Sequence, residues 1–216
     1  MSTKQRSHLC DTPREELAST LTHGMGALLG AAALVWMLRL ADGDLFRTVS
    51  AGVFGGSLVL LYTSSTLYHA CSRPRLKAFF QWLDHACIYL LIAGSYTPLT
   101  LVSLRGAWGW SLFGIVWFLA LAGVVMKTFV SGKKDHWIST ALYLAMGWLV
   151  VVALGPVMRA LPPGGFAWLV AGGVSYTLGV AFFVWERLPF NHAIWHLFVL
   201  AGSLCHVIAV ALYILR

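Results

Sequence analysis

The chain has 216 residues, of which 59% are hydrophobic and only 11% charged, a composition that excludes an ordinary soluble domain. Its ten tryptophans and twenty-one glycines suit a membrane protein, where they serve as interface anchors and close-packing residues. The net charge of +7 does not require a nucleic-acid partner, because membrane topology and anionic lipid account for an excess of Lys and Arg.

Seven stretches without Asp, Glu, Lys or Arg follow one another along the chain. They are Leu17–Leu38, Thr48–Ser72, His85–Leu104, Gly106–Met126, His136–Met158, Ala160–Trp185 and Leu188–Leu215. Each reaches the roughly 20 residues that a helix needs to cross the hydrocarbon core. Their apolar residues are continuous rather than alternating, which disfavours strands. We therefore expect an all-α, seven-transmembrane-helix bundle over residues 17–216, preceded by a cytoplasmic tail at 1–16.

The distribution of Lys and Arg predicts the orientation of this bundle. With the N-terminus inside, ten of the 15 lie in cytoplasmic segments and five on the opposite side. The positive-inside rule then favours a cytoplasmic N-terminus and an external C-terminus. We expect an integral multi-pass protein of the cell (inner or plasma) membrane.

Two proline-containing stretches predict local structure. DTPREE, at 11–16, is typical of a helix start, with Asp11 or Thr12 as the cap and Pro13 in the first turn. We expect this turn to lie along the membrane surface before the first span. In GSYTP, Tyr96 and Pro98 predict a helix kink whose freed carbonyls line a cavity.

Several polar side chains interrupt the apolar stretches, where they are costly and therefore candidates for function. They are His23, Ser65, His69, Asp84, His85, His192, His196 and His206. In the predicted topology His69 ends the second span and Asp84 begins the third, both on the cytoplasmic side. The seventh span begins on that side with His192 and His196. This shared depth favours one polar site, whereas His85 and His206 are expected to be packing residues.

The spacing of the histidines points to metal chemistry. His192 and His196 are four positions apart and share one helix face. With His69 as a third ligand, they would leave a fourth position open for water, as in catalytic zinc sites. Ser65, one turn before His69, would orient a ligand or the water, and Asp84 would accept a proton.

Three segments together resemble the hemolysin III family. They are SSTLYH at 64–69, LDHACIYLLIAGSYTPLTL at 83–101 and NHAIWHLFVLAGSLCHV at 191–207, and THGMGALLG at 22–30 fits the family's first helix. This family is grouped with the progestin and adipoQ receptors and the alkaline ceramidases, which are seven-helix membrane proteins. The resemblance implies a zinc ion near the cytoplasmic surface, bound by His69, His192 and His196. It also implies that Ser65 and Asp84 belong to the site, since an aspartate meets the zinc through water in the adiponectin receptors.

Three functions remain open at this point. The first is regulation of membrane lipid state through zinc-dependent hydrolysis of an acyl lipid, such as a ceramide-like amide, that enters laterally between helices. The second is a non-enzymatic lipid or membrane sensor in which zinc is structural. The third, suggested by the family's name, is a pore-forming cytolysin, although polarity concentrated in the cytoplasmic half is unlike a channel. Membrane lipids are the expected partners, nucleic acid is not, and the sequence does not predict an oligomeric state.

Overall fold

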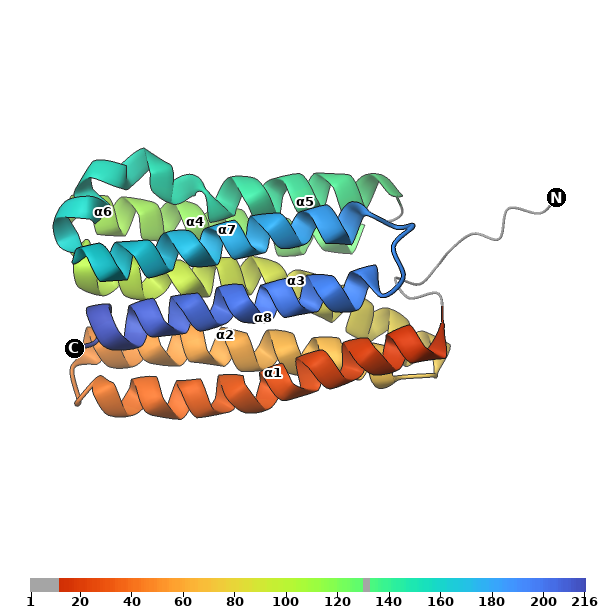
Figure 1. The fold of residues 1–216 in the computed structure, drawn as a ribbon. Coiled ribbons are helices and arrows are strands. Elements are labelled where there is room, and N and C mark those ends of the chain that lie inside the picture. Colours follow the sequence, from red (N-terminus) through yellow and green to blue (C-terminus); the bar gives the residue numbers. More distant parts are fainter. Residues whose placement is uncertain (1–11, 130–132) are drawn as a thin grey trace.

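The described part of the chain is built from helices joined by short connections. A computed structural model describes residues 12–129 and 133–216, with side chains from residue 137 onward in the second range. Within these ranges seven helical segments are long and apolar enough to cross a membrane, and no strand is present. The predicted all-α, seven-span fold is thereby confirmed. Figure 1 shows the helices as one bundle, with the start of α1 and the C-terminus at opposite ends.

The helices follow the predicted spans closely. They are α1 (Pro13–Leu40), α2 (Leu45–Ala70), α3 (Pro74–Pro98), α4 (Ala107–Phe129), α5 (Lys133–Gly147), α6 (Leu154–Ala160), α7 (Pro163–Val184) and α8 (Asn191–Ala209). Short π-helical segments, Leu99–Ser103 and Val210–Ile214, extend α3 and α8. A π-helical turn follows Pro98, which lacks a backbone hydrogen-bond donor, whereas the predicted kink with carbonyls lining a cavity stays a prediction.

The start of α1 is fixed by a reciprocal cap. Thr12 Oγ1 accepts a hydrogen bond from the Glu15 backbone N–H, and Glu15 Oε2 accepts one from the Thr12 N–H. Such a capping box satisfies two of the N–H groups that a helix start leaves without partners. The predicted helix start is correct, but the expected surface segment is not separate, because α1 runs without a break from Pro13 into the first span.

The fifth span differs from a single helix. It consists of α5, a 3₁₀ segment (Leu149–Ala153) and α6, and the break follows Gly147. Tyr96 of α3 bridges this break: its hydroxyl lies 2.9 Å from Gly147 O and accepts a hydrogen bond from the Val150 N–H at 2.8 Å. A broken helix is tolerated at membrane depth when protein groups satisfy the freed backbone atoms.

The interior of the bundle is organised around α3, which is the most buried of the seven spans. Large side chains of α2, including Phe54, Leu58 and Tyr62, are almost fully enclosed. Apolar side chains also cover the outside, as expected for helices surrounded by lipid, and examples are Leu21, Leu28 and Phe118.

Candidate metal centre

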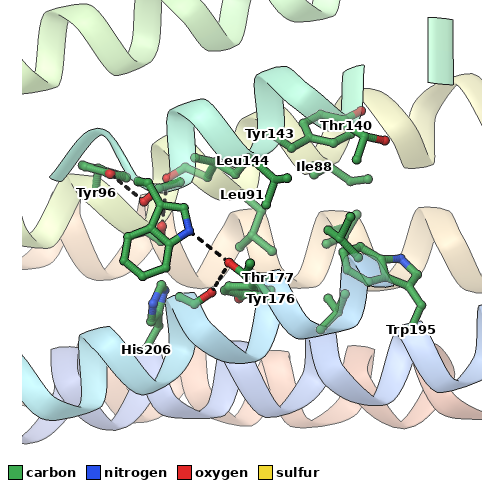
Figure 2. A pocket seen from close by; sticks show the side chains of 18 of the residues that line it. Ile88, Leu91, Tyr96, Thr140, Tyr143, Leu144, Tyr176, Thr177, Trp195 and His206 are labelled. Carbon is green, nitrogen blue, oxygen red and sulfur yellow. Dashed lines mark hydrogen bonds between the residues drawn. The ribbon is translucent and has the colours of Figure 1, made fainter. Parts of the chain in front are cut away.

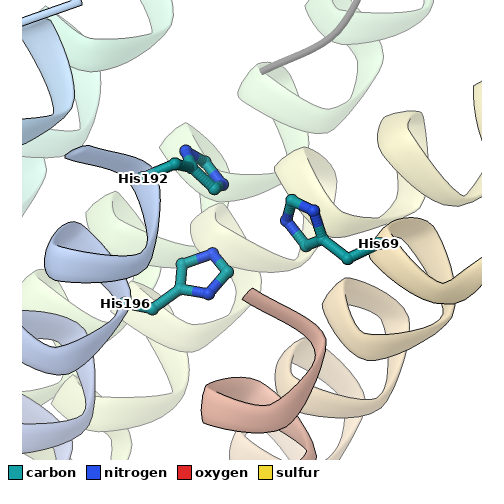
Figure 3. Close-up of side chains that lie close together, drawn as sticks. All are labelled: His69, His192 and His196. Atoms are coloured by element: carbon teal, nitrogen blue, oxygen red, sulfur yellow. The ribbon is translucent and has the colours of Figure 1, made fainter. Parts of the chain in front are cut away.

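Three histidines from two helices converge near the end of the bundle where α1 begins. His69 comes from the last turn of α2, and His192 and His196 come from the first two turns of α8. One ring nitrogen from each lies within 4.8 Å of the others, and all three side chains are buried. Figure 3 shows the His69 ring facing the two rings of α8. The structure brings together the three histidines that the sequence singled out, and the cluster could hold a metal ion.

The hydrogen bonds behind two of these rings fit metal ligation. His69 Nδ1 lies 2.7 Å from Glu16 Oε2, so that nitrogen donates to a carboxylate and Nε2 is the one that can ligate. His196 Nδ1 lies 3.2 Å from Thr22 Oγ1, which leaves the same ring nitrogen, Nε2, for a metal. Metal-bound histidines usually donate their other N–H to an oxygen in this way. Three imidazoles, two of them with their tautomers fixed in this way, are a donor set that suits zinc.

Glu16 was not identified from the sequence as a site residue. Its other carboxylate oxygen, Oε1, lies 2.7 Å from Lys77 Nζ, so one side chain connects α1 with α2 and α3. An acidic residue at the start of an apolar span is a signal in itself, because ionisable groups there are rare. In the sequence, however, Glu16 resembled an ordinary first-turn residue that complements the helix dipole.

Asp84 and Ser65 form a second polar pair beside the histidines. Asp84 is buried, and its carboxyl interacts with the hydroxyl of Ser65 and electrostatically with Lys127. The contact is not ideal, since Ser65 Oγ has no hydrogen-bond partner of good geometry within the described residues. The three-histidine cluster does not include Asp84 as a ligand. The predicted roles of Ser65 and Asp84 beside the metal ligands stay predictions.

A cavity of about 180 Å³ extends from this polar end into the apolar interior. His192, His196 and Asp84 line it, and most of its remaining wall is apolar and comes from α3, α5, α7 and α8. Figure 2 shows Thr140 and Trp195 towards one end of the cavity, and Tyr96 and His206 towards the other. Two of the three candidate metal ligands, His192 and His196, therefore face a space that an apolar chain can enter.

His206 and His85 occupy the places expected of packing residues. The ring of His206 lies against α7, where Nε2 is 3.3 Å from the Leu169 carbonyl oxygen, and a side chain at Gly172 would collide with it. The backbone carbonyl of His85 accepts a hydrogen bond from the Tyr143 hydroxyl at 2.9 Å. Both residues line the cavity, but neither belongs to the histidine cluster.

The fold and the cluster together define a multi-pass membrane protein with a buried three-histidine site. Comparisons with known proteins identify the family of this chain. The family described as Haemolysin-III related matches residues 12–207. Hemolysin-3 of Bacillus cereus is 44% identical over 215 residues, covering 99% of this chain and 98% of that protein. A Hemolysin-3 homolog of Bacillus subtilis (strain 168) is also 44% identical, over 207 residues that cover 95% of this chain and 97% of that protein.

The human monocyte to macrophage differentiation factor is 31% identical over 214 residues, covering 94% of this chain and 85% of that protein. The chain belongs to the haemolysin III family.

Proposed function

We propose that this protein binds zinc through His69, His192 and His196 and regulates the lipid state of its membrane by hydrolysing an acyl lipid. The observation that carries the proposal is the cavity, because candidate ligands and a buried carboxylate line one end of an apolar space. A site for a soluble substrate would not need such walls, whereas an acyl chain fits them. A ceramide-like amide is the preferred substrate class, and it enters laterally between helices.

The chain's own residues have defined tasks in this reaction. The apolar wall holds the acyl chain, so that the amide or ester carbonyl lies at the polar end beside His192 and His196. Bound zinc supplies a Lewis acid that polarises the carbonyl and activates water. Asp84 accepts the proton of the attacking water and passes it to the leaving nitrogen or oxygen as the C–N or C–O bond breaks. Ser65, one turn before His69 on α2, orients a ligand or the water.

The site is assigned to the cytoplasmic half of the cell membrane. It lies near the start of α1, and the excess of Lys and Arg on that side supports an internal N-terminus by the positive-inside rule. Cytoplasmic water can therefore reach the polar end of the cavity while the lipid enters from the bilayer.

A lipid hydrolysis assay tests the proposal. Purified protein loaded with zinc is incubated with ceramide and a panel of other acyl lipids, and released fatty acid is measured by mass spectrometry. We expect turnover by the wild type and none by Asp84→Ala, with equal zinc content in the two proteins. If the wild type releases no more fatty acid than Asp84→Ala from any lipid, the enzymatic function is refuted.

A structural role for zinc is the second candidate, and one observation favours it. The ligands come from both α2 and α8, so an ion bound between them would join two helices far apart in sequence. Such a protein would sense or tune the membrane without turnover. In that case His196→Ala would lower the melting temperature and the membrane phenotype together, and Asp84→Ala would change neither.

A further inference from the structure

Helix α1 contributes no ligand to the three-histidine cluster, yet its first three turns contact the elements that carry all three ligands. Glu16 contacts His69, Thr22 contacts His196, and Glu15 contacts the backbone just before His192. These contacts join positions separated by 53, 174 and 175 residues, so they exist only in the folded bundle. Helix α1 thus contacts the surroundings of every ligand in the cluster.

The contact at His69 is the strongest of the three. Its Nδ1–H donates to Glu16 Oε2 at 2.7 Å, and a carboxylate acceptor makes the opposite ring nitrogen a better metal ligand. Lys77 holds the same carboxylate through a 2.7 Å contact to Oε1, and its ammonium group also donates to the Tyr68 carbonyl oxygen at 3.3 Å. Glu16 is thus fixed from both sides, and the His69 ring with it.

The contact at His196 selects the tautomer of that ring. The Thr22 hydroxyl has one proton, which it donates within α1 to the carbonyl oxygens of Ala18 and Ser19 at 2.9 and 3.0 Å. Its oxygen is therefore an acceptor for His196 Nδ1–H at 3.2 Å, and the Ser19 backbone also hydrogen-bonds His196. With Nδ1 protonated, Nε2 carries the lone pair for the metal.

The contact before His192 acts on the backbone. Phe190 caps the start of α8 in a left-handed conformation, with φ of 58°, which is uncommon for a residue other than glycine. Its N–H donates to Glu15 Oε1 at 3.0 Å, while the other oxygen of Glu15 caps α1. Glu15 therefore fixes the turn from which α8, with His192 and His196, starts.

We propose that residues 12–22 of α1 position the metal ligands, and that Glu16 is the principal positioning residue because it directs the His69 ring. The inference rests on the proposed zinc site and adds the part of the chain that sets its affinity. Loss of Glu16 leaves all three ligands present but weakens binding. Partners of this kind typically change metal affinity about 10–100-fold.

The experiment measures zinc affinity in the full-length purified protein by competition with a chromogenic chelator. We expect Glu16→Gln to weaken zinc binding about 10–100-fold. Glu186→Gln is the matched control, because Glu186 is an exposed acid near the same end of the bundle, and its affinity should equal that of the wild type. The melting temperatures of the zinc-free proteins are compared, so that a loss of fold is not mistaken for a loss of affinity.

Cobalt spectroscopy separates positioning from ligation. Co²⁺ bound to Glu16→Gln should give the ligand-field bands of the wild type at higher metal concentration, because the ligand set is unchanged. His69→Ala should give different bands, since a ligand is lost. Equal zinc affinity of Glu16→Gln and wild type overturns the inference and leaves the proposed function standing.

Three other outcomes are also decisive. If Glu16→Gln does not fold, Thr22→Val replaces it, because this change keeps the side-chain shape and removes only the oxygen that accepts from His196. An unchanged affinity in Thr22→Val then overturns the inference. A wild type that binds no zinc overturns the inference and the proposed function together, whereas normal zinc results without lipid turnover refute only the hydrolase.

Discussion

The ring of His23 lies flat on the ring of His196, with their centroids 3.4 Å apart and their planes 9° from parallel. His23 is buried, its two nitrogens have no hydrogen-bond partner within the described residues, and it lines the cavity beside the cluster. A buried polar group without partners costs stability, about 1–3 kcal/mol in typical cases. In the proposed hydrolysis, its position at the cavity wall allows it to hydrogen-bond the polar group of the lipid.

This position leads to a prediction for His23→Phe. The change keeps an aromatic ring against His196 but removes both nitrogens, so zinc content should stay at the wild-type level. The melting temperature should be equal to or above that of the wild type, because the cost of the buried polar atoms disappears. Lipid turnover should fall. Metal analysis, thermal unfolding and the fatty-acid assay check these points, and loss of zinc would show instead that His23 is a ligand.

Removing two ligands tests the metal site itself. The double variant His192→Ala/His196→Ala leaves only His69, and one imidazole does not hold zinc tightly. We expect zinc to fall from one per chain in the wild type to background, measured by mass spectrometry of the purified protein. His206→Asn is the control. Because His206 lies outside the cluster, this variant should keep the zinc content of the wild type. Equal zinc in the double variant and the wild type would contradict the assignment of the ligands.

Two adjacent glycines of α2 offer a matched test of helix packing. A Cβ at Gly55 would lie 2.8 Å from the backbone Cα of Leu34 on α1, whereas a Cβ at Gly56 would meet nothing within 4 Å. Gly55→Ala should destabilise the protein by about 1–3 kcal/mol, because backbone cannot move aside easily. Gly56→Ala should be neutral or stabilising by up to about 1 kcal/mol. Thermal unfolding in detergent compares the two, and equal melting temperatures would contradict the close approach of α1 and α2.

The seven spans and the histidine cluster were predictable from the sequence because both depend on local regularities. Apolar length identifies a span, and spacing of four places His192 and His196 on one helix face. The antiparallel order of the spans then gives His69 the same depth. The break in the fifth span was missed, because it depends on Tyr96, a residue of another helix that hydrogen-bonds the backbone around Gly147.

The contacts behind the cluster were beyond sequence reasoning for a similar reason. Glu16 and Thr22 have ordinary local explanations, since a first-turn acid complements the helix dipole and a helical threonine bonds the preceding turn. Their contacts with His69 and His196 arise from the packing of α1 against α2 and α8. A pattern read along one helix does not contain that information.

Removal of the metal distinguishes the two proposed roles of zinc. Binding to the folded state alone stabilises it by about 2.7 kcal/mol when free zinc is 100 times the dissociation constant, so a chelator should lower the wild-type melting temperature by several degrees. His196→Ala, which lacks a ligand, should melt at the same temperature with and without chelator. Asp84→Ala should behave like the wild type in this measurement, because Asp84 is not part of the ligand cluster.

If Asp84→Ala responds normally to the chelator but has lost lipid turnover, zinc acts in catalysis. If turnover is absent in every protein and only the melting temperatures respond, zinc holds α2 and α8 together and has no chemical step to perform.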